Sequence, residues 1–328
     1  VVPWALAFAP DSRLFVTERP GRVRVIQEGA LLPDPAISIA EVAATGEGGL
    51  LGLALAPDFP TTHHVFVYYT YRSERGLRNR VVRYVEQDNT LLETARVILD
   101  DIPAGSIHDG GLLAFGPDAK LYVTTGDASQ ADLAQNRDSL AGKILRINPD
   151  GTVPADNPFP GSPVYSFGHR NPQGLAWQPQ TRQLYATEHG PTGNDEVNLI
   201  EAGQNYGWPT AQGPQHPAPF RAPLAAYSPS VAPAGATFYT ADLIPQWRGS
   251  FLFGTLRGTH LHRIAFDATD PRRVAAQEGL YEDTFGRLRA VVQGPDGAVY
   301  VTTSNRDGRG SPQAGDDRIL RIAPAAGG

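Results

Sequence analysis

Six copies of one short pattern run along the chain, and this repetition limits the possible folds more than any other feature of the sequence. Each copy reads as a strand, a turn that usually contains Pro and Asp, and a second strand with alternating apolar residues, which is typical of a tight antiparallel hairpin. The copies lie at residues 6–18, 53–70, 113–127, 175–190, 237–258 and 291–305. The copy at 237–258 is the most degenerate of them.

A further strand follows each hairpin, as in the phrase GKILRINPDG that begins at residue 142. Repeated antiparallel units at intervals of roughly 45 to 65 residues predict an all-β fold, a six-bladed β-propeller of four-stranded antiparallel blades. A tandem β-sandwich is the alternative, but a sandwich does not require a repeated phrase. No linker or change of composition divides the chain, so we expect residues 1–328 to form a single propeller domain.

Composition excludes several classes of protein. With 35 Gly and 29 Pro among 328 residues the chain is unsuited to long helical bundles, while a hydrophobic content of 41% supports a real core. A net charge of −6 gives no support for nucleic-acid binding, and the absence of Cys excludes disulfides and thiolate metal sites. No apolar run approaches the roughly 18 residues of a membrane helix, and the start VVPWALAFAP lacks the pattern of a signal peptide.

The long connections between strands are where a propeller builds its functional face. The informative insertions are 104–112, 127–142, 188–215 and 304–316, and the best candidate for a helix spans 129–143.

One insertion carries a candidate general base. His108 precedes a Gly-Gly pair that opens a strand, and histidine suits acid–base chemistry near neutral pH. Asp127 ends the paired strand of the same hairpin, so its carboxylate can hold the imidazole in one tautomer. The alternative is a loop histidine bonded only to backbone, and the nearby Asp127 favours the catalytic pair.

Two further segments are rich in polar groups. The phrase GHRNPQGLAW places Arg170, Asn171 and Gln173 around a turn, either as a ligand-facing wall or as a polar turn that bonds its own backbone. The phrase EHGPTGNDEVNLI offers Asp195, Glu196 and many carbonyl oxygens, the ligands that calcium prefers. Solvated turn charges are the alternative there.

Arginines suggest an anion site. Arg287 and Arg289 are two residues apart and therefore share one face of a strand, and Arg257 occupies the equivalent region of the preceding blade. Three guanidinium groups from adjacent blades would bind a polyanionic small molecule. The same Arg-x-Arg spacing in GRVRV at 21–25 shows that the pattern can also decorate a solvent face.

Six longer motifs, in order along nearly the whole chain, resemble those of the soluble aldose sugar dehydrogenases that depend on pyrroloquinoline quinone (PQQ), the glucose/sorbosone dehydrogenase family. They are PWALAFAPD with VTERPGRVRV, GEGGLLGLALAPDF, the His108 hairpin with TTGD, GHRNPQGLAW, EHGPTGNDEVNLI with GQNYGWP, and FGRLRAVVQGPDGAVYVTTSNRDG. The resemblance implies PQQ and Ca²⁺ as cofactors, an aldose oxidised at C1 to the lactone, and an external electron acceptor. It also implies a location in the periplasm or outside the cell, and we expect a monomer.

The resemblance assigns roles to individual residues. His108 resembles the catalytic base, Asp127 its partner, and Arg170 the group that contacts the quinone oxygen. Residues that resemble the cofactor-binding set are Glu47, His108, Arg170, Asn171, Gln173, Arg257, Arg287 and Arg289. Carbonyls of Gly190 and Pro191 resemble the ligands of the cofactor calcium, and Glu196 with the Tyr206 carbonyl those of a second, structural calcium.

Two positions depart from the family pattern. Glu47 stands where glucose-oxidising members have Gln, and Arg257 stands where Lys is common. A calcium-dependent lactonase, in which His108 activates water, is the competing enzymatic hypothesis, and a propeller that only binds a partner is the third.

Overall fold

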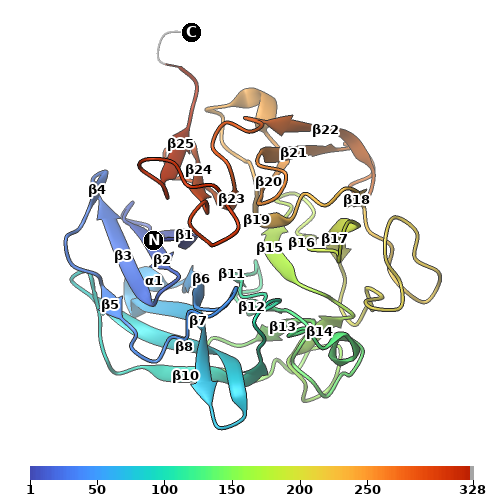
Figure 1. Ribbon diagram of the computed structural model, residues 1–328, viewed down its shortest axis with the longest axis horizontal. Helices are drawn as coiled ribbons and strands as arrows, with labels where there is room; N and C mark the ends of the chain where they lie inside the picture. The colour runs from blue at the N-terminus through green and yellow to red at the C-terminus, as the bar shows by residue number, and fades with distance from the viewer. Residues whose placement is uncertain (326–328) are drawn as a thin grey trace.

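The computed structural model describes residues 1–325 and contains six antiparallel sheets arranged around a central axis (Figure 1). The first sheet contains β1 (Pro3–Phe8), β2 (Leu14–Glu18), β3 (Arg22–Gln27), β4 (Ala30–Leu31) and β5 (Ile37–Ser38). The second contains β6 (Leu50–Leu55), β7 (His64–Ser73), β8 (Gly76–Gln87), β9 (Thr90–Leu91) and β10 (Arg96–Pro103). The third contains β11 (Leu113–Phe115), β12 (Leu121–Thr125), β13 (Lys143–Ile147) and β14 (Val164–Phe167).

The remaining sheets complete the ring. The fourth contains β15 (Pro172–Trp177), β16 (Leu184–Glu188), β17 (Asp195–Ile200) and β18 (Ala225–Tyr227). The fifth contains β19 (Pro233–Phe238), β20 (Phe251–Thr255), β21 (Leu261–Phe266) and β22 (Val274–Leu280). The sixth contains β23 (Leu288–Gln293), β24 (Val299–Thr303) and β25 (Ile319–Ile322).

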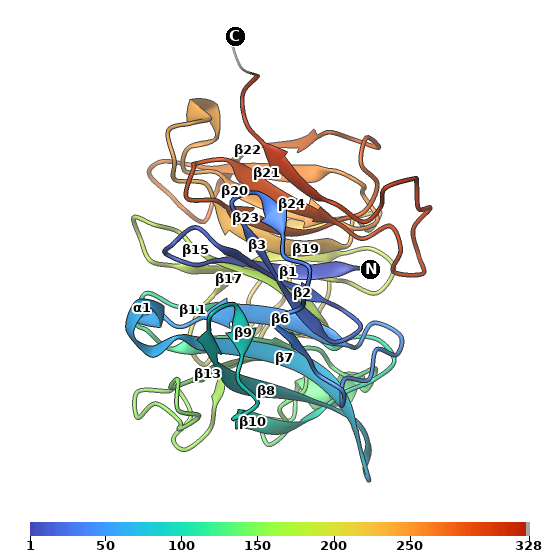
Figure 2. The same cartoon turned by 90° about the vertical axis from the view of Figure 1, so that its left-hand side faces the viewer.

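The six-bladed propeller predicted from the repeats is confirmed. Each predicted hairpin is the first strand pair of one blade, and the strand predicted after it is the third strand of that blade. Four strands form the main path of the first five sheets, whereas the sixth has three within residues 1–325. The innermost strands β1 and β23 contact each other and close the ring, and Figure 2 shows the first and last sheets side by side.

Blades adhere to their neighbours through apolar contacts and a few buried hydroxyl groups. Leu14 and Val16 of the first blade pack against Ala290 of the sixth. The hydroxyl of Thr17 donates to the Leu51 carbonyl of the next blade at 2.6 Å, so a polar bond accompanies the apolar seam. These contacts fix each inner strand relative to its neighbours. They thereby also fix the positions at which the loops begin and end.

The helix expected over 129–143 is wrong, because this segment holds only a short 3₁₀ turn, η1 (Ala131–Ala134). Lys143 is fully buried, and its ammonium group donates to the carbonyls of Leu133, Ala134 and Ala141 at 2.6–3.0 Å. A regular helix would use such carbonyls for its own backbone bonds. The buried cation therefore gathers them into an irregular loop.

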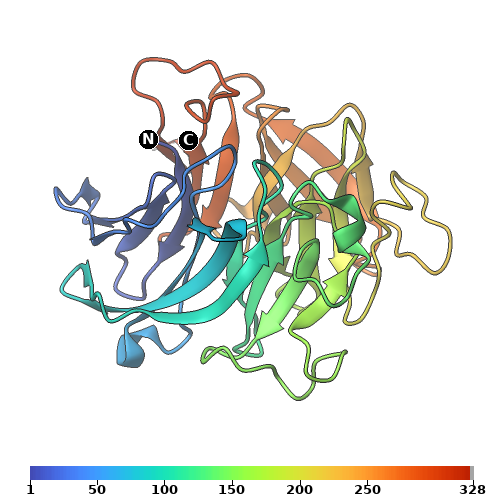
Figure 3. The ribbon, with the colours of Figure 1, turned by 60° about the horizontal axis from the view of Figure 1, so that its bottom comes forward.

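The other helical segments are as short as η1. They are α1 (Phe59–Thr62), in the turn of the second hairpin, and η2 (Pro245–Trp247) in the fifth blade. Within residues 1–325 no helix has the length and apolar character needed to cross a membrane. The longest connection between two consecutive strands joins β17 to β18, and it projects from the edge of the ring (Figure 3).

Candidate active site

A cavity of about 500 Å³ opens among the loops, and every blade contributes to its wall. Three of the four insertions singled out from the sequence, 104–112, 188–215 and 304–316, supply lining residues. The predicted site residues that line it are Glu47, His108, Arg170, Gln173, Gly190, Pro191, Arg257, Arg287 and Arg289. Asp127, Asn171, Glu196 and Tyr206 do not line this cavity.

His108 and Asp127 form the pair that the sequence predicts. The Nδ1 atom of His108 lies 2.8 Å from Oδ1 of Asp127, and both side chains are buried. A carboxylate only accepts, so Nδ1 carries the proton and Nε2 keeps its lone pair. The imidazole is thereby set in the tautomer that a general base at the cavity wall requires.

The backbone around His108 is bent to bring the imidazole to the wall. His108 has φ +65° and Gly110 has φ +61°. A Cβ atom at position 110 would lie 2.7 Å from the Thr124 carbonyl oxygen, so only glycine fits there. The Gly-Gly pair after His108 therefore lets the loop press against the neighbouring strand β12.

The polar residues at the start of the fourth blade divide into two that line the cavity and two that are buried. Arg170 and Gln173 line the cavity, whereas His169 and Asn171 are completely buried behind it. The Oδ1 atom of Asn171 accepts the Gly110 N–H at 3.0 Å, so Asn171 supports the His108 loop. Arg170 and Gln173 thus form part of the wall, whereas Asn171 bonds the backbone of the third blade and His169 bonds the side chains of Ser166 and Glu188, rather than the backbone of their own turn.

Arg170 is held at the wall by main-chain oxygen. Its Nη1 donates to the Gly190 carbonyl at 2.8 Å, and its Nε is buried without a hydrogen-bond partner in the described chain. Burial lowers the pKa of Arg170. An unpaired guanidinium nitrogen beside the cavity is a donor available to a bound ligand.

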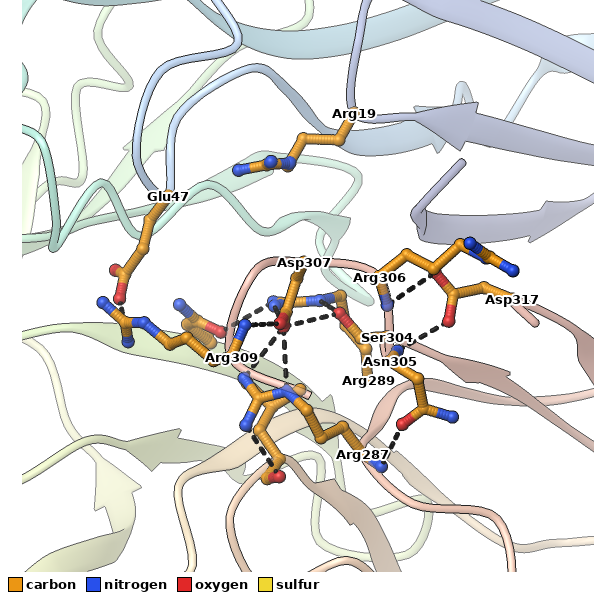
Figure 4. A network of polar contacts seen from close by, with 12 residues as sticks. Arg19, Glu47, Arg287, Arg289, Ser304, Asn305, Arg306, Asp307, Arg309 and Asp317 are labelled. Carbon is orange, nitrogen blue, oxygen red and sulfur yellow. Dashed lines mark hydrogen bonds and ion pairs between the residues drawn. The ribbon is translucent and has the colours of Figure 1, made fainter. Parts of the chain in front are cut away.

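Two arginines of the sixth blade converge on one carboxylate (Figure 4). Arg287 donates through Nε and Nη2 to Oδ2 of Asp307 at 2.9 and 2.8 Å, while Nη2 of Arg289 lies 3.6 Å from that oxygen. Burial lowers the pKa of Arg289 to about 10. Burial alone would raise the pKa of Asp307, but the charges of Arg287 and Arg289 together with the hydrogen bonds from Arg287 and the Arg309 N–H lower it.

Glu47 bridges the cavity mouth. Its Oε2 accepts the His108 backbone N–H at 2.9 Å, and its Oε1 pairs with Nη1 of Arg309 at 2.7 Å. Burial alone would raise the pKa of Glu47, but the His108 N–H, His189 and Arg309 together lower it. The carboxylate that replaces the expected Gln is therefore neutralised by Arg309 rather than left to repel an anionic ligand.

Comparison with known proteins decides the family. The sequence profile described as Glucose / Sorbosone dehydrogenase matches residues 1–320. The chain belongs to the glucose/sorbosone dehydrogenase family. It is 33% identical to an aldose sugar dehydrogenase of Escherichia coli over 98% of this chain and 90% of that protein. It is also 38% identical to an uncharacterized Synechocystis protein, over 94% of this chain and 82% of that one.

Solved structures agree with this membership. A putative oxidoreductase (glucose dehydrogenase) of Thermus thermophilus superposes with a TM-score of 0.90 at 48% identity, covering 98% of this chain and 96% of that chain. The PQQ-bound aldose sugar dehydrogenase of Streptomyces coelicolor gives 0.89 at 40% identity, covering 98% and 94%. The chain is therefore an oxidoreductase of a quinoprotein family, as the motifs indicate.

The cavity of this family member fits a polycarboxylate such as PQQ. Six arginines line it, against three acidic residues, and the Arg170 Nε has no protein partner. The arginines are Arg19, Arg170, Arg257, Arg287, Arg289 and Arg309, and the acidic residues are Glu47, Asp109 and Asp307. Guanidinium groups bind carboxylates with bidentate geometry, so this wall suits a ligand with several of them.

Calcium has two candidate positions that differ in fit. Gly190 and Pro191 line the cavity, and carbonyl oxygen is a ligand type that calcium accepts. The Gly190 carbonyl already accepts from Nη1 of Arg170 at 2.8 Å, so it would have to share its oxygen with, or be released by, that guanidinium to bind an ion. Within residues 1–325 no cluster of three or more His, Cys, Asp or Glu could hold a metal ion. An ion beside Gly190 would therefore need further oxygen ligands from a bound cofactor.

At the second position the carboxylate is already in contact with other polar groups. Oε1 of Glu196 lies 3.3 Å from Nε2 of the completely buried His216 side chain, and Oε2 accepts the Asn198 amide at 3.0 Å. Burial raises the pKa of Glu196. An ion bound here would have to displace the contact with His216, and Glu196 with the Tyr206 carbonyl as ligands of a structural calcium stays a prediction.

Several lining residues were missed by sequence reasoning. Asp307 and Arg309 lie in the phrase SNRDGRG, and Arg19 in VTERPG, where nothing but proximity to a motif marks them. His189 precedes Gly190 and lines the cavity with a buried Nε2 that has no hydrogen-bond partner in the described chain. Their roles depend on contacts across blades, which spacing along one segment cannot reveal.

Asp109 gives this site a testable pH dependence. Burial raises its pKa to about 6, and its Oδ2 has no hydrogen-bond partner among the described residues. In the unfolded chain the pKa is about 3.9. The folded state therefore binds the proton more tightly, and the resulting stabilisation is complete below about pH 4 and is lost as the pH rises through 6.

An Asp109→Asn variant cannot lose this stabilisation. We expect its free energy of unfolding to fall less than that of the parent between pH 4 and pH 7, by up to about 3 kcal/mol. Urea unfolding at both pH values measures the difference, with Asp138→Asn on an exposed loop as control. Equal pH dependence in the parent and Asp109→Asn would contradict the assignment.

Proposed function

We propose that this protein oxidises aldose sugars at C1 to the lactone, with PQQ and calcium as cofactors and an external electron acceptor. The observation that carries the proposal is the His108–Asp127 pair at the wall of an arginine-lined cavity. The Streptomyces coelicolor relative whose structure contains PQQ supports the choice of cofactor. We further propose that the chain acts as a monomer in the periplasm or outside the cell.

The residues of the chain divide the work. His108 takes the proton of the C1 hydroxyl on Nε2, while Asp127 on Nδ1 stabilises the imidazolium that forms. Arg287, Arg289 and Arg257 would hold the carboxylates of PQQ, and carbonyls of Gly190 and Pro191 would bind its calcium. When bound, PQQ would supply an acceptor for the C1 hydride, and calcium would supply Lewis-acid polarisation of the quinone.

Arg170 and Gln173 complete the pocket. Arg170 stands on the Gly190 carbonyl with Nε unpaired, which suits a donor to a quinone oxygen. Gln173 accepts from Nη1 of Arg289 at 3.2 Å and so orients that guanidinium. The competing lactonase would use acidic metal ligands at the axis, and the arginines that occupy the cavity instead favour the dehydrogenase.

Reconstitution tests the proposal. Protein stripped of metal is mixed with PQQ and calcium, and reduction of an artificial dye is followed after addition of glucose or other aldoses. We expect turnover only when both cofactors are present. Hydrolysis of gluconolactone without PQQ, together with no dye reduction, would replace the proposal by the lactonase.

A further inference from the structure

Trp208 lies in the connection after β17 and touches two groups of the proposed active site without lining the large cavity. We infer that Trp208 is a positioning residue, which orients the Asp127 carboxylate through its indole N–H and supports Arg170 with its ring. The inference rests on the proposed function, because it concerns the same proton transfer.

The indole completes the hydrogen bonding of Asp127. Nε1 of Trp208 donates to Oδ2 of Asp127 at 2.8 Å, while Oδ1 faces Nδ1 of His108 at 2.8 Å. Oδ1 also accepts the Ser129 N–H at 2.8 Å, so the indole is the only one of these three partners on Oδ2, and the carboxylate cannot rotate without breaking at least one of the three bonds. A residue from another blade therefore helps to orient the carboxylate that holds the imidazole.

The ring of the same indole packs against Arg170. The Arg170 Cζ atom lies 5.3 Å from the ring centroid, within the range of a cation–π contact. The backbone N–H of Asp127 also donates to the Arg170 carbonyl at 2.8 Å. Trp208 therefore braces two groups whose main chains are already joined.

Trp208 is itself held on both sides of its main chain. Its N–H donates to the Gly168 carbonyl at 3.0 Å, and its carbonyl accepts from Nε2 of Gln135 at 2.6 Å. Gln135 and Asn205 exchange two further amide bonds at 2.8 and 3.1 Å. A side chain anchored in this way has little freedom, which a positioning role requires.

Two substitutions separate the N–H from the ring. Trp208→Phe keeps an aromatic ring beside Arg170 but removes the donor to Asp127. We expect kcat to fall about tenfold to a hundredfold, the loss expected for one charge-assisted hydrogen bond, while the KM for the sugar and the Kd for PQQ stay within about threefold. Trp208→Ala removes the ring as well, so the Kd for PQQ is expected to rise too.

The matched control is Trp177→Phe. Trp177 packs on Tyr122, with ring centroids 5.1 Å apart, and does not line the cavity. Its replacement is expected to leave kcat and Kd unchanged. A kcat for Trp208→Phe within threefold of the parent would overturn the inference, as would an equal loss in Trp177→Phe.

A second measurement does not depend on turnover. The Nδ1 proton of His108, bonded to a carboxylate, is expected as a low-field proton signal in the NMR spectrum of the cofactor-free protein, absent in His108→Gln. In Trp208→Phe this signal is expected to shift or broaden through faster exchange. An unchanged signal would overturn the inference even if the proposed sugar oxidation failed.

Should Trp208→Phe fail to fold, Gln135→Leu tests the same chain of contacts. It releases the Trp208 carbonyl and leaves the indole in place, so the same NMR signal is expected to broaden. An unaltered signal in folded Gln135→Leu and no loss of kcat would overturn the inference.

Discussion

A His108→Gln enzyme is expected to lose at least about a hundredfold in kcat while it still binds PQQ and calcium. Glutamine preserves size and polarity but cannot accept the C1 hydroxyl proton. The imidazole of His108 is hydrogen-bonded to Asp127, and its backbone N–H donates to Glu47. Because the bond to Glu47 comes from the backbone, the substitution is expected to remove the base without moving the loop. Loss of kcat with an unchanged Kd for PQQ therefore assigns proton transfer to this residue.

Dye reduction under single-turnover conditions measures the effect, and PQQ titration of the same preparation measures binding. His64→Gln is the matched control, because His64 lies at the start of β7 and does not line the cavity, and it should behave as the parent. Wild-type turnover in His108→Gln would remove His108 from the mechanism. Parallel loss of PQQ binding would instead make it a cofactor ligand.

Replacing Arg289 by Ala is expected to weaken PQQ binding by about a hundredfold or more. Arg289 is buried, and its loss removes a charge-assisted bond and leaves Asp307 with one guanidinium fewer. The exposed Arg257 side chain is more solvated, so Arg257→Ala is expected to cost less. Fluorescence titration of the cofactor-free proteins measures both constants.

The control for folding is the thermal midpoint of each variant without cofactor. Some destabilisation of Arg289→Ala is expected, because a buried carboxylate loses part of its neutralising charge. If Arg289→Ala binds PQQ as tightly as the parent, the PQQ carboxylates are bound by other residues of the cavity wall. A larger loss in Arg257→Ala than in Arg289→Ala would reverse the ranking given by burial.

The propeller could be predicted because its repeat is local. Each hairpin depends on the alternation of apolar and polar residues and on turn residues, all within about fifteen consecutive positions of the sequence. The sequence of 129–143 predicts a helix, but the segment folds as an irregular loop. The reason is the buried ammonium group of Lys143, which binds carbonyl oxygens that a helix would use for its own hydrogen bonds. Local propensity says nothing of such tertiary contacts.

The site, too, was predictable where its contacts are local and unpredictable where they join distant parts of the chain. His108 and Asp127 share one hairpin, so their pairing followed from the sequence. Glu47 was expected at the cavity, but its partner Arg309 comes from the opposite end of the chain. His216 covers Glu196 by way of a long irregular connection, and no spacing rule could foresee it. Contacts between blades require the folded ring.

The closure of the ring through β1 and β23 has a consequence for stability. The cavity wall is built from all six blades, so a ligand that fills it would bind tightly only when the first and last blades are in contact. The bound cofactor would thus stabilise the closed ring, and the fraction of molecules with an open ring would fall as the cofactor concentration rises. At a hundred times Kd this linkage amounts to about 2.7 kcal/mol.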